Sequence, residues 1–188
     1  MNRRDLLKGL VCSATGLIVP SFVSAGTLLS DIPLRLYNAH TKERYDIELF
    51  VNGGWNKAAL LVCDWMMRDW RQTETVQCDR QLYAAMYVVQ RHFSADSPII
   101  VNSGYRSSTT NENLRKRALK KTGGKITLEV PAVNSLHIKG KALDFEIKGV
   151  SNKALAKKVK ELEFGGVGRY PGFVHMDTGR VRQWGLPV

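Results

Sequence analysis

Cysteine is scarce in this sequence, and the spacing of the cysteines excludes several familiar sites. Three occur among 188 residues, at positions 12, 63 and 78. None belongs to a C-x-x-C pair, so the pattern favours neither a zinc ribbon nor thioredoxin-type redox chemistry. Cys63 and Cys78 leave two interpretations open. They either form a disulfide after export, which would stabilise the fold by about 3 kcal/mol, or remain two buried thiols.

A long apolar run is also missing. The nearest candidate, residues 10–23, is shorter than the roughly 20 residues of a membrane-spanning helix, and Gly16 and Pro20 interrupt it. A basic start precedes this stretch and Val-Ser-Ala ends it, which is typical of a secretory signal peptide cleaved after Ala25. We expect residues 1–25 to be removed, leaving a mature protein with no stable membrane span.

The string NRRDLLK at residues 2–8 resembles the twin-arginine export motif, in which paired arginines precede apolar positions. Proteins that carry this motif fold before they are exported. We therefore expect export by the twin-arginine route to the periplasm or cell envelope.

Acidic residues are outnumbered, since 17 Asp and Glu stand against 28 Lys and Arg and give a formal charge of +11. Removal of residues 1–25 takes away three basic residues and one acidic residue, which leaves +9. Outside the cytoplasm such a surface meets cell-wall carboxylates and anionic lipids rather than nucleic acid. The basic residues of 111–121 have no interleaved aromatics for base stacking, so we expect no nucleic-acid partner.

No internal repeat or low-complexity run divides the chain, so residues 26–188 fit one domain, which we expect to be a monomer. Alternating apolar and polar residues predict strands, and apolar residues three and four positions apart predict helices. The order of these elements gives an α+β fold, in which a small antiparallel sheet carries the functional site and packs against N-terminal helices. The predicted elements are a hairpin over 34–49, helices over 57–70, 79–93, 111–121 and 152–162, and strands over 98–103, 142–147, 166–170 and 173–177.

Histidine is rare as well, and its distribution is informative. The chain has four, of which His137 and His175 fall near carboxylates in the strand-rich C-terminal half. His137 and Asp144 flank a turn at Gly140, so a bend could bring them together, and His175 on a neighbouring strand could add a third ligand. Two histidines and one carboxylate form a catalytic zinc set with an open position for water. The spacing alone also fits structural histidines or a surface turn.

The residues around these three carry a resemblance. Residues 135–144 match S-x-H-x-x-G-x-A-x-D, residues 175–177 match H-x-D, and residues 103–107 read SGYRS. Together these motifs resemble the zinc D-alanyl-D-alanine peptidase and Hedgehog-like superfamily. The strings at 165–170 and 173–179 are similar to its twin-arginine-exported murein endopeptidase K-like branch. The resemblance covers nearly the whole mature chain.

The resemblance implies a role for each matching residue. The zinc ligands would be His137, Asp144 and His175, and zinc (Zn²⁺) would polarise the scissile carbonyl and activate water. Arg106 matches the substrate-facing arginine of the superfamily. Its charged fork suits a stem-peptide carboxylate or a developing oxyanion, and the alternative is a loop salt bridge.

Smaller residues of the motifs suggest supporting roles. Ser103 and Ser135 are candidates for orienting ligands or substrate through their hydroxyls, and capping of their own loops is the alternative. Gly140 lets the backbone pass close to the metal, and the small Ala142 leaves room beside it.

The chain departs from the superfamily at the general base. Carboxypeptidase relatives carry an acid three positions before the last ligand, where this chain has Gly172, and Hedgehog-type relatives carry one six positions before, here Arg169. Neither residue can accept a proton. Asp177 follows His175 by two positions and so projects to the same side of a strand. It is the candidate catalytic base or, alternatively, an orienter of the metal site.

The leading hypothesis is a zinc metallopeptidase that cleaves peptide cross-links of peptidoglycan, with the peptide stems as its partner. The residues do not distinguish L,D from D,D bonds, and the resemblance favours endopeptidase over carboxypeptidase action. The alternative hypothesis is a catalytically inactive module that binds peptidoglycan or a protein through the same cleft, which the missing upstream acid favours.

Overall fold

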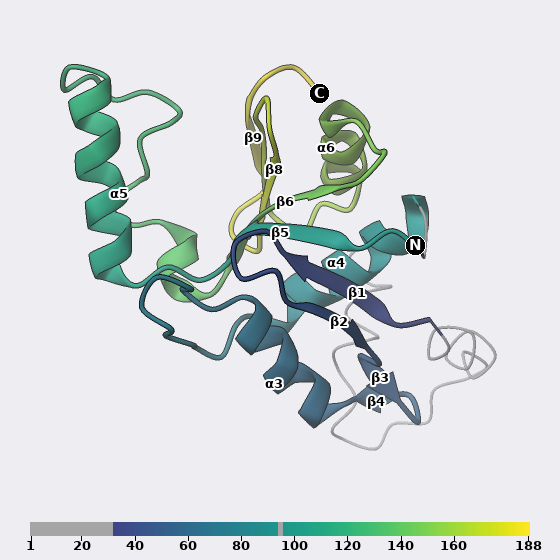
Figure 1. The fold of residues 1–188 in the computed structure, drawn as a ribbon. Helices are drawn as coiled ribbons and strands as arrows, with labels where there is room; N and C mark the ends of the chain where they lie inside the picture. The colour runs from purple at the N-terminus through teal and green to yellow at the C-terminus, as the bar shows by residue number, and fades with distance from the viewer. Residues whose placement is uncertain (1–31, 94–95) are drawn as a thin grey trace.

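A mixed sheet of seven strands forms the centre of the fold (Figure 1). The computed structural model describes residues 32–93 and 96–188, so the predicted signal peptide over 1–25 lies outside the described residues. The strands run in the order β2-β1-β5-β6-β8-β7-β9 across the sheet, and β3 pairs with β4 separately. Their bounds are Leu34–Asn38 (β1), Arg44–Ile47 (β2), Phe50–Val51 (β3), Gly54–Trp55 (β4), Ile99–Ser103 (β5), Ala142–Ile147 (β6), Gly166–Arg169 (β7), Val174–Asp177 (β8) and Arg182–Gly185 (β9).

The predicted α+β class is confirmed, and so is the first hairpin. β1 and β2 pair antiparallel, with Leu34 opposite Ile47, and buried and half-buried residues alternate along β1. The sheet is larger than expected and mixed rather than purely antiparallel, because β1 runs parallel to β5 and β9 runs parallel to β7. Parallel neighbours are not joined by a short turn, so alternation within one segment does not reveal them.

Four α-helices and one 3₁₀ helix lie in the described part of the chain, and none of them is long and apolar enough to cross a membrane. Asn56, Ser107 and Ser151 accept hydrogen bonds from the first N–H groups of α3, α5 and α6, which satisfies donors that have no partner within the helix. α3 ends earlier than expected because the next N–H groups leave the helical pattern: that of Arg68 donates to the Trp65 carbonyl and that of Asp69 to the Glu74 carbonyl. The bounds are Lys57–Met66 (α3), Arg80–Phe93 (α4), Ser108–Lys121 (α5), Leu136–Lys139 (η1) and Asn152–Glu161 (α6).

One hydrophobic core connects the sheet to α3, α4 and α6. Leu34, Leu36, Tyr83 and Phe145 are each 1% exposed or less. α6 packs on β7 and β8, while α4 packs on β1 and β6. Burial of apolar surface stabilises the folded state by about 25 cal/mol per Å². The contacts of these helices with the sheet therefore help to hold the central strands in place. The division of the chain into residues 1–25 and 26–188 stays a prediction.

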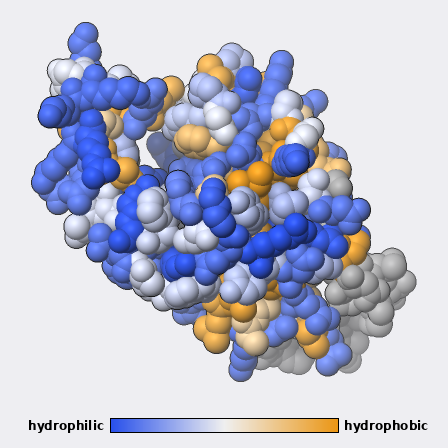
Figure 2. All heavy atoms as spheres, viewed as in Figure 1, coloured by the Kyte–Doolittle hydropathy of each residue, from blue (hydrophilic) through white to orange (hydrophobic). Residues whose placement is uncertain are grey.

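α5 projects from the rest of the molecule together with the loop that leads back to η1 (Figure 1). Only Thr110 and Asn111 of this helix are buried, and the projecting surface is hydrophilic (Figure 2). Arg115 ties the returning loop to the helix by donating to the Pro131 carbonyl at 2.7 Å. The predicted basic segment is therefore part of an arm that stands beside the sheet.

Gly104 fixes how the chain leaves β5. A Cβ atom at this position would lie 2.4 Å from the Met67 carbonyl oxygen, so only glycine fits. Tyr105 donates its N–H to the same carbonyl at 2.6 Å. The end of α3 and the loop after β5 are therefore held together.

Gly104→Ala should lower the free energy of unfolding by roughly 3 kcal/mol, the upper end of the usual effect of forcing an extra group into a packed site. Gly172→Ala is the matched control, since no atom of the described part of the chain lies within 4 Å of a Cβ at that position. Urea unfolding followed by circular dichroism measures both variants. Equal stability of the two would contradict the close contact.

Cys63 and Cys78 are free thiols in the structure, and both are buried. Of the two interpretations left open by the sequence, the structure therefore shows the unpaired thiols. Burial raises the pKa of Cys78 to about 12 and also raises the pKa of Cys63.

Neither thiol of the folded mature protein should react with an aromatic disulfide reagent at pH 8, because the thiolate is the reactive form and burial suppresses it. Both should react promptly in concentrated urea. A spectrophotometric thiol count under the two conditions is the measurement. Prompt labelling of the folded protein would contradict the buried thiols, and a count of zero in urea would show a disulfide instead.

Candidate metal centre

Two neighbouring strands place Asp144 and His175 directly opposite each other. β6 and β8 pair antiparallel, with Asp144 beside His175 and Ala142 beside Asp177. Facing residues of such a pair project to the same side of the sheet, so these four share one face. Asp144 Oδ1 lies 2.8 Å from His175 Nδ1.

His137 reaches the same point from η1. This helix ends at Gly140, whose φ of +61° is left-handed and whose missing Cβ would lie 3.1 Å from the Cys78 Cα. The His137 side chain is 1% exposed, and its Nδ1 lies 2.6 Å from the Gly104 carbonyl oxygen. Because a carbonyl only accepts hydrogen bonds, Nδ1 carries the proton and Nε2 offers its lone pair to the cluster.

His137, Asp144 and His175 thus form one cluster, with a ligand atom of each within 4.8 Å of the others. His137 Nε2 lies 3.3 Å from both Asp144 Oδ1 and His175 Nδ1. Burial acts to raise the pKa of Asp144, but the two imidazoles hold it well below its ordinary range. Burial lowers the pKa of His137. The chain therefore presents an ionised carboxylate beside imidazole nitrogens, which is a suitable donor set for a divalent metal ion.

Asp177 holds His175 from the other side. It is fully buried, and its Oδ2 lies 3.0 Å from His175 Nε2. Arg182 donates to both carboxylate oxygens, at 3.0 and 2.7 Å. The backbone N–H groups of Gly166 and Gly179 each donate to Oδ1 at 2.9 Å. Burial acts to raise the pKa of Asp177, but these donors keep it well below its ordinary range.

An ionised Asp177 determines the tautomer of His175. The carboxylate accepts the Nε2–H, which leaves Nδ1 as the nitrogen that faces Asp144 and His137. Burial disfavours a charged imidazole, yet the hydrogen bonds to the two carboxylates raise the pKa of His175. A metal ion at this point therefore competes with a proton for Nδ1.

Arg106 lies at the edge of the cluster. Its Nη2 is 3.7 Å from Asp144 Oδ2, and its buried Nε has no hydrogen-bond partner among the described residues. Asp69 fixes the loop by accepting the N–H and the hydroxyl of Ser107 at 3.0 and 2.9 Å. Because the distance to Asp144 is too long for a hydrogen bond, the guanidinium still has N–H groups that can donate to a ligand. Asp69 follows α3 in a polar stretch with no motif, so this support could not be predicted from the residues around it.

The two candidate serines take different positions around the cluster. Ser135 is the N-cap of η1, and its hydroxyl accepts the His137 N–H at 3.4 Å. Ser103 faces Asp144 across the β5–β6 pair, beside an irregularity in the register. Capping by Ser135 is therefore observed, and contact of either serine with a substrate stays a prediction.

A cleft of about 690 Å³ opens over the cluster. The loop between α5 and η1 lines one side of it, with Leu128 and Pro131, and the turn between β7 and β8 contributes Tyr170 and Phe173. Figure 2 shows a hollow between the projecting α5 arm and the body of the molecule. The volume is ordinary for a site that binds a small ligand or a peptide segment.

Three residues beside the cluster were missed by the sequence reasoning. Arg182 and Trp184 lie on β9, and Tyr170 directly follows β7. The Trp184 ring centroid is 5.1 Å from that of His175, and its Nε1 donates to the Tyr170 hydroxyl at 2.9 Å. The two-residue spacing of Arg182 and Trp184 could have indicated a strand, but their partners come from other strands.

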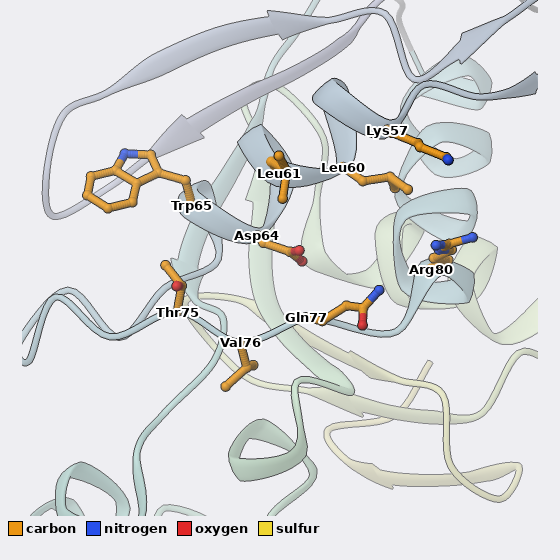
Figure 3. Close-up of a pocket in the computed structure, with 9 residues that line it drawn as sticks. All are labelled: Lys57, Leu60, Leu61, Asp64, Trp65, Thr75, Val76, Gln77 and Arg80. Atoms are coloured by element: carbon orange, nitrogen blue, oxygen red, sulfur yellow. The ribbon is translucent and has the colours of Figure 1, made fainter.

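A second hollow, of about 610 Å³, lies between α3 and the segment that precedes α4 (Figure 3). Leu61 and Trp65 border it, and no histidine is among the described residues that line it. The carboxylate of Asp64 already accepts the Cys78 N–H at 2.9 Å and the Tyr83 hydroxyl at 2.6 Å. This hollow therefore lacks the donor set of the first.

Comparison with known proteins bears on the same residues. A protein-family model described as peptidoglycan L,D-endopeptidase MepK matches residues 30–184. The protein named peptidoglycan L,D-endopeptidase MepK of Escherichia coli (strain K12) is 35% identical over 187 residues, which cover 97% of this chain and 97% of that protein. A protein of Haemophilus influenzae named probable peptidoglycan L,D-endopeptidase MepK is 37% identical over 154 residues, or 80% of this chain and 77% of the other.

Asp177→Asn should weaken metal binding by about 10- to 100-fold, the usual effect of removing a carboxylate that orients a metal-binding histidine. Competition with a chelator of known affinity, followed by metal analysis, measures the change. Asp46→Asn is the matched control, because Asp46 is a half-exposed carboxylate on β2 that pairs with Arg35. Full metal binding combined with lost turnover would instead identify Asp177 as the base.

Proposed function

The chain belongs to the peptidoglycan L,D-endopeptidase MepK family, and on this premise we propose that it is a zinc-dependent endopeptidase that hydrolyses peptide cross-links of peptidoglycan. The observation that carries the proposal is the convergence of His137, Asp144 and His175 in one cleft. The relatives are named L,D-endopeptidases. We therefore propose that the bond cleaved is an L,D linkage, such as that of 3-3 cross-links between peptide stems.

Zinc fits the residues that are present. Two imidazole nitrogens and one carboxylate oxygen suit zinc and leave a position open, whereas magnesium and calcium prefer oxygen donors alone. The Gly104 carbonyl and the Asp177 carboxylate hold the outer nitrogens of the two imidazoles, so both inner lone pairs are fixed in advance. When bound, zinc supplies Lewis acidity and lowers the pKa of water toward neutrality.

Arg106 is suited to bind the substrate. Peptide stems carry carboxylates, and a guanidinium binds a carboxylate through two parallel hydrogen bonds. Within residues 32–93 and 96–188 the buried Nε of Arg106 has no partner, and its Nη2 lies 3.7 Å from Asp144. A carboxylate or a polarised carbonyl of the substrate would complete these hydrogen bonds in a setting that water screens poorly. Ser135 lines the same cleft, and Ser103 lies opposite Asp144 on β5.

For Asp177 the surroundings favour the orienting role over that of the base. A general base must present a lone pair to the water that it deprotonates. Asp177 is fully buried, and Arg182, His175 and two backbone N–H groups all share its two oxygens. We infer that Asp177 acts through His175, as a positioning residue.

The same proposal extends to location and partners. The relatives are named for peptidoglycan, so the chain would act in the periplasm or cell envelope, delivered by the twin-arginine signal at residues 1–25. The positive surface of a mature monomer suits a wall that is rich in stem carboxylates. The idle binding module is the weaker alternative, since the cluster keeps all three donors beside an open cleft.

Mature protein loaded with zinc should convert 3-3 cross-linked muropeptide dimers into monomers, as followed by liquid chromatography and mass spectrometry. A chelator should abolish the conversion and added zinc should restore it. His175→Ala should lower turnover roughly a thousandfold, because a Lewis acid contributes several kcal/mol to such a reaction.

His40→Ala is the matched control for this experiment, since His40 lies outside the cluster and its Nε2 is 2.9 Å from the Asn102 carbonyl oxygen. It should leave turnover unchanged. Zinc-loaded wild-type protein that releases no monomer would refute the enzyme, and binding to sacculi that survives His175→Ala would then support a binding module.

A further inference from the structure

Tyr170 stands in the wall of the cleft with no role assigned so far. Its N–H donates to the Phe173 carbonyl at 3.0 Å and closes the turn between β7 and β8. Its ring stacks on Phe173, with centroids 4.6 Å apart and planes within 18° of each other. The turn and the stack therefore fix the ring before any substrate arrives, in a cleft that Arg106 and the metal cluster also line.

Trp184 determines how the Tyr170 hydroxyl can be used. Its indole Nε1–H donates to the hydroxyl oxygen at 2.9 Å, and an indole nitrogen can only donate. The hydroxyl is thus the acceptor in this pair, and its own proton needs a different acceptor. The contact it makes in the described structure, to the Leu128 carbonyl at 3.4 Å, is longer than the roughly 2.5–3.0 Å of a good O–H···O bond.

Trp184 is itself held in place by its surroundings. A Cβ on Gly168 would lie 2.6 Å from the indole, so the ring lies directly on the β7 backbone. The Arg182 guanidinium stacks 4.7 Å from the ring centroid. The His175 ring contacts the indole at 5.1 Å between centroids, with the two planes tilted by 54°. The phenolic oxygen is therefore separated from a predicted metal ligand by a single fixed indole.

Resting on the proposed function, we propose that the Tyr170 hydroxyl donates a hydrogen bond to the carbonyl oxygen of the scissile peptide bond as negative charge develops on it. Tyr170 keeps its proton throughout, so this role needs no base. Trp184 is the positioning residue. Its indole N–H donates to the Tyr170 hydroxyl oxygen, so the hydroxyl proton of Tyr170 must point toward another acceptor. Burial raises the pKa of Tyr170 above its ordinary value, which keeps the phenol protonated at neutral pH.

This role fits a site without an acid three or six positions before His175, where the carboxypeptidase and Hedgehog-type members of the superfamily are expected to carry one. Gly172 and Arg169 stand at the two positions in question. Besides Asp144 and Asp177, the cleft is lined by Glu129, whose side chain is 66% exposed and pairs with Lys121. A fixed donor aimed at a developing oxyanion contributes about 100- to 1,000-fold to the rate, so Tyr170 would supply stabilisation that needs no further carboxylate.

Tyr170→Phe tests the proposal, because it removes one oxygen and keeps the ring that stacks on Phe173. With a defined 3-3 cross-linked dimer as substrate, kcat should fall about 100-fold while KM changes less than about twofold. Zinc content and melting temperature should match the wild type. Tyr45→Phe is the matched control, since Tyr45 is an exposed tyrosine of β2, and it should keep full turnover.

Trp184→Phe tests the positioning role, because it keeps an aromatic ring on Gly168 and removes the N–H. It should lower kcat by about 10-fold, and the double variant should be no slower than Tyr170→Phe alone, since Trp184 acts through the hydroxyl. An active wild type with unchanged kcat in Tyr170→Phe would overturn this proposal and leave the proposed function standing. Two other results would also overturn it: losses of kcat that add in the double variant, and loss of bound zinc in Tyr170→Phe. An inactive wild type would overturn both this proposal and the proposed function.

Discussion

The antiparallel pairing of β6 with β8 is the constraint on which the rest of the site depends. It sets Asp144 against His175, and a shift of one residue in either strand would turn that strand's ligand to the opposite face. The pairing also creates a problem, because a buried carboxylate is costly unless charges or donors surround it. His137 approaches Asp144 from η1 and Arg106 approaches it from the loop after β5, so the strands set the position of the charge and these two side chains stabilise it.

Each imidazole of the cluster is then fixed by an acceptor on a different element. His137 is held by the carbonyl of Gly104, and Gly104 is itself in contact with the backbone of Met67 at the end of α3. His175 is held by Asp177, which Arg182 holds in turn. The lone pairs that converge are thus oriented by parts of the chain that lie far apart in the sequence, and a metal ion would meet donors that need little rearrangement.

This arrangement explains which features the sequence could predict. Strands such as 142–147 were predictable because alternation is local, and the ligands were predictable because a motif keeps their neighbours together. The hydrogen bond of Asp69 to Ser107 spans 38 positions, and nothing near Asp69 indicates its partner. The donors around Asp177 also come from distant parts of the chain and could not be predicted from its neighbours. The sequence therefore left two roles open for Asp177, the catalytic base and the orienter of His175. The donors that surround its carboxylate favour the orienting role.

β9 shows how much one unrecognised strand can contribute. It pairs in parallel with β7, and the register places Arg182 beside Gly166 and Trp184 beside Gly168. A Cβ on either glycine would lie within 2.6 Å of the facing side chain, so two glycines on one strand make room for two large residues on the next. Since alternate residues share a face, one strand delivers both a cation to Asp177 and an indole to His175. The two glycines of the predicted strand 166–170 therefore provide the surface on which Arg182 and Trp184, the supports of the metal centre, rest.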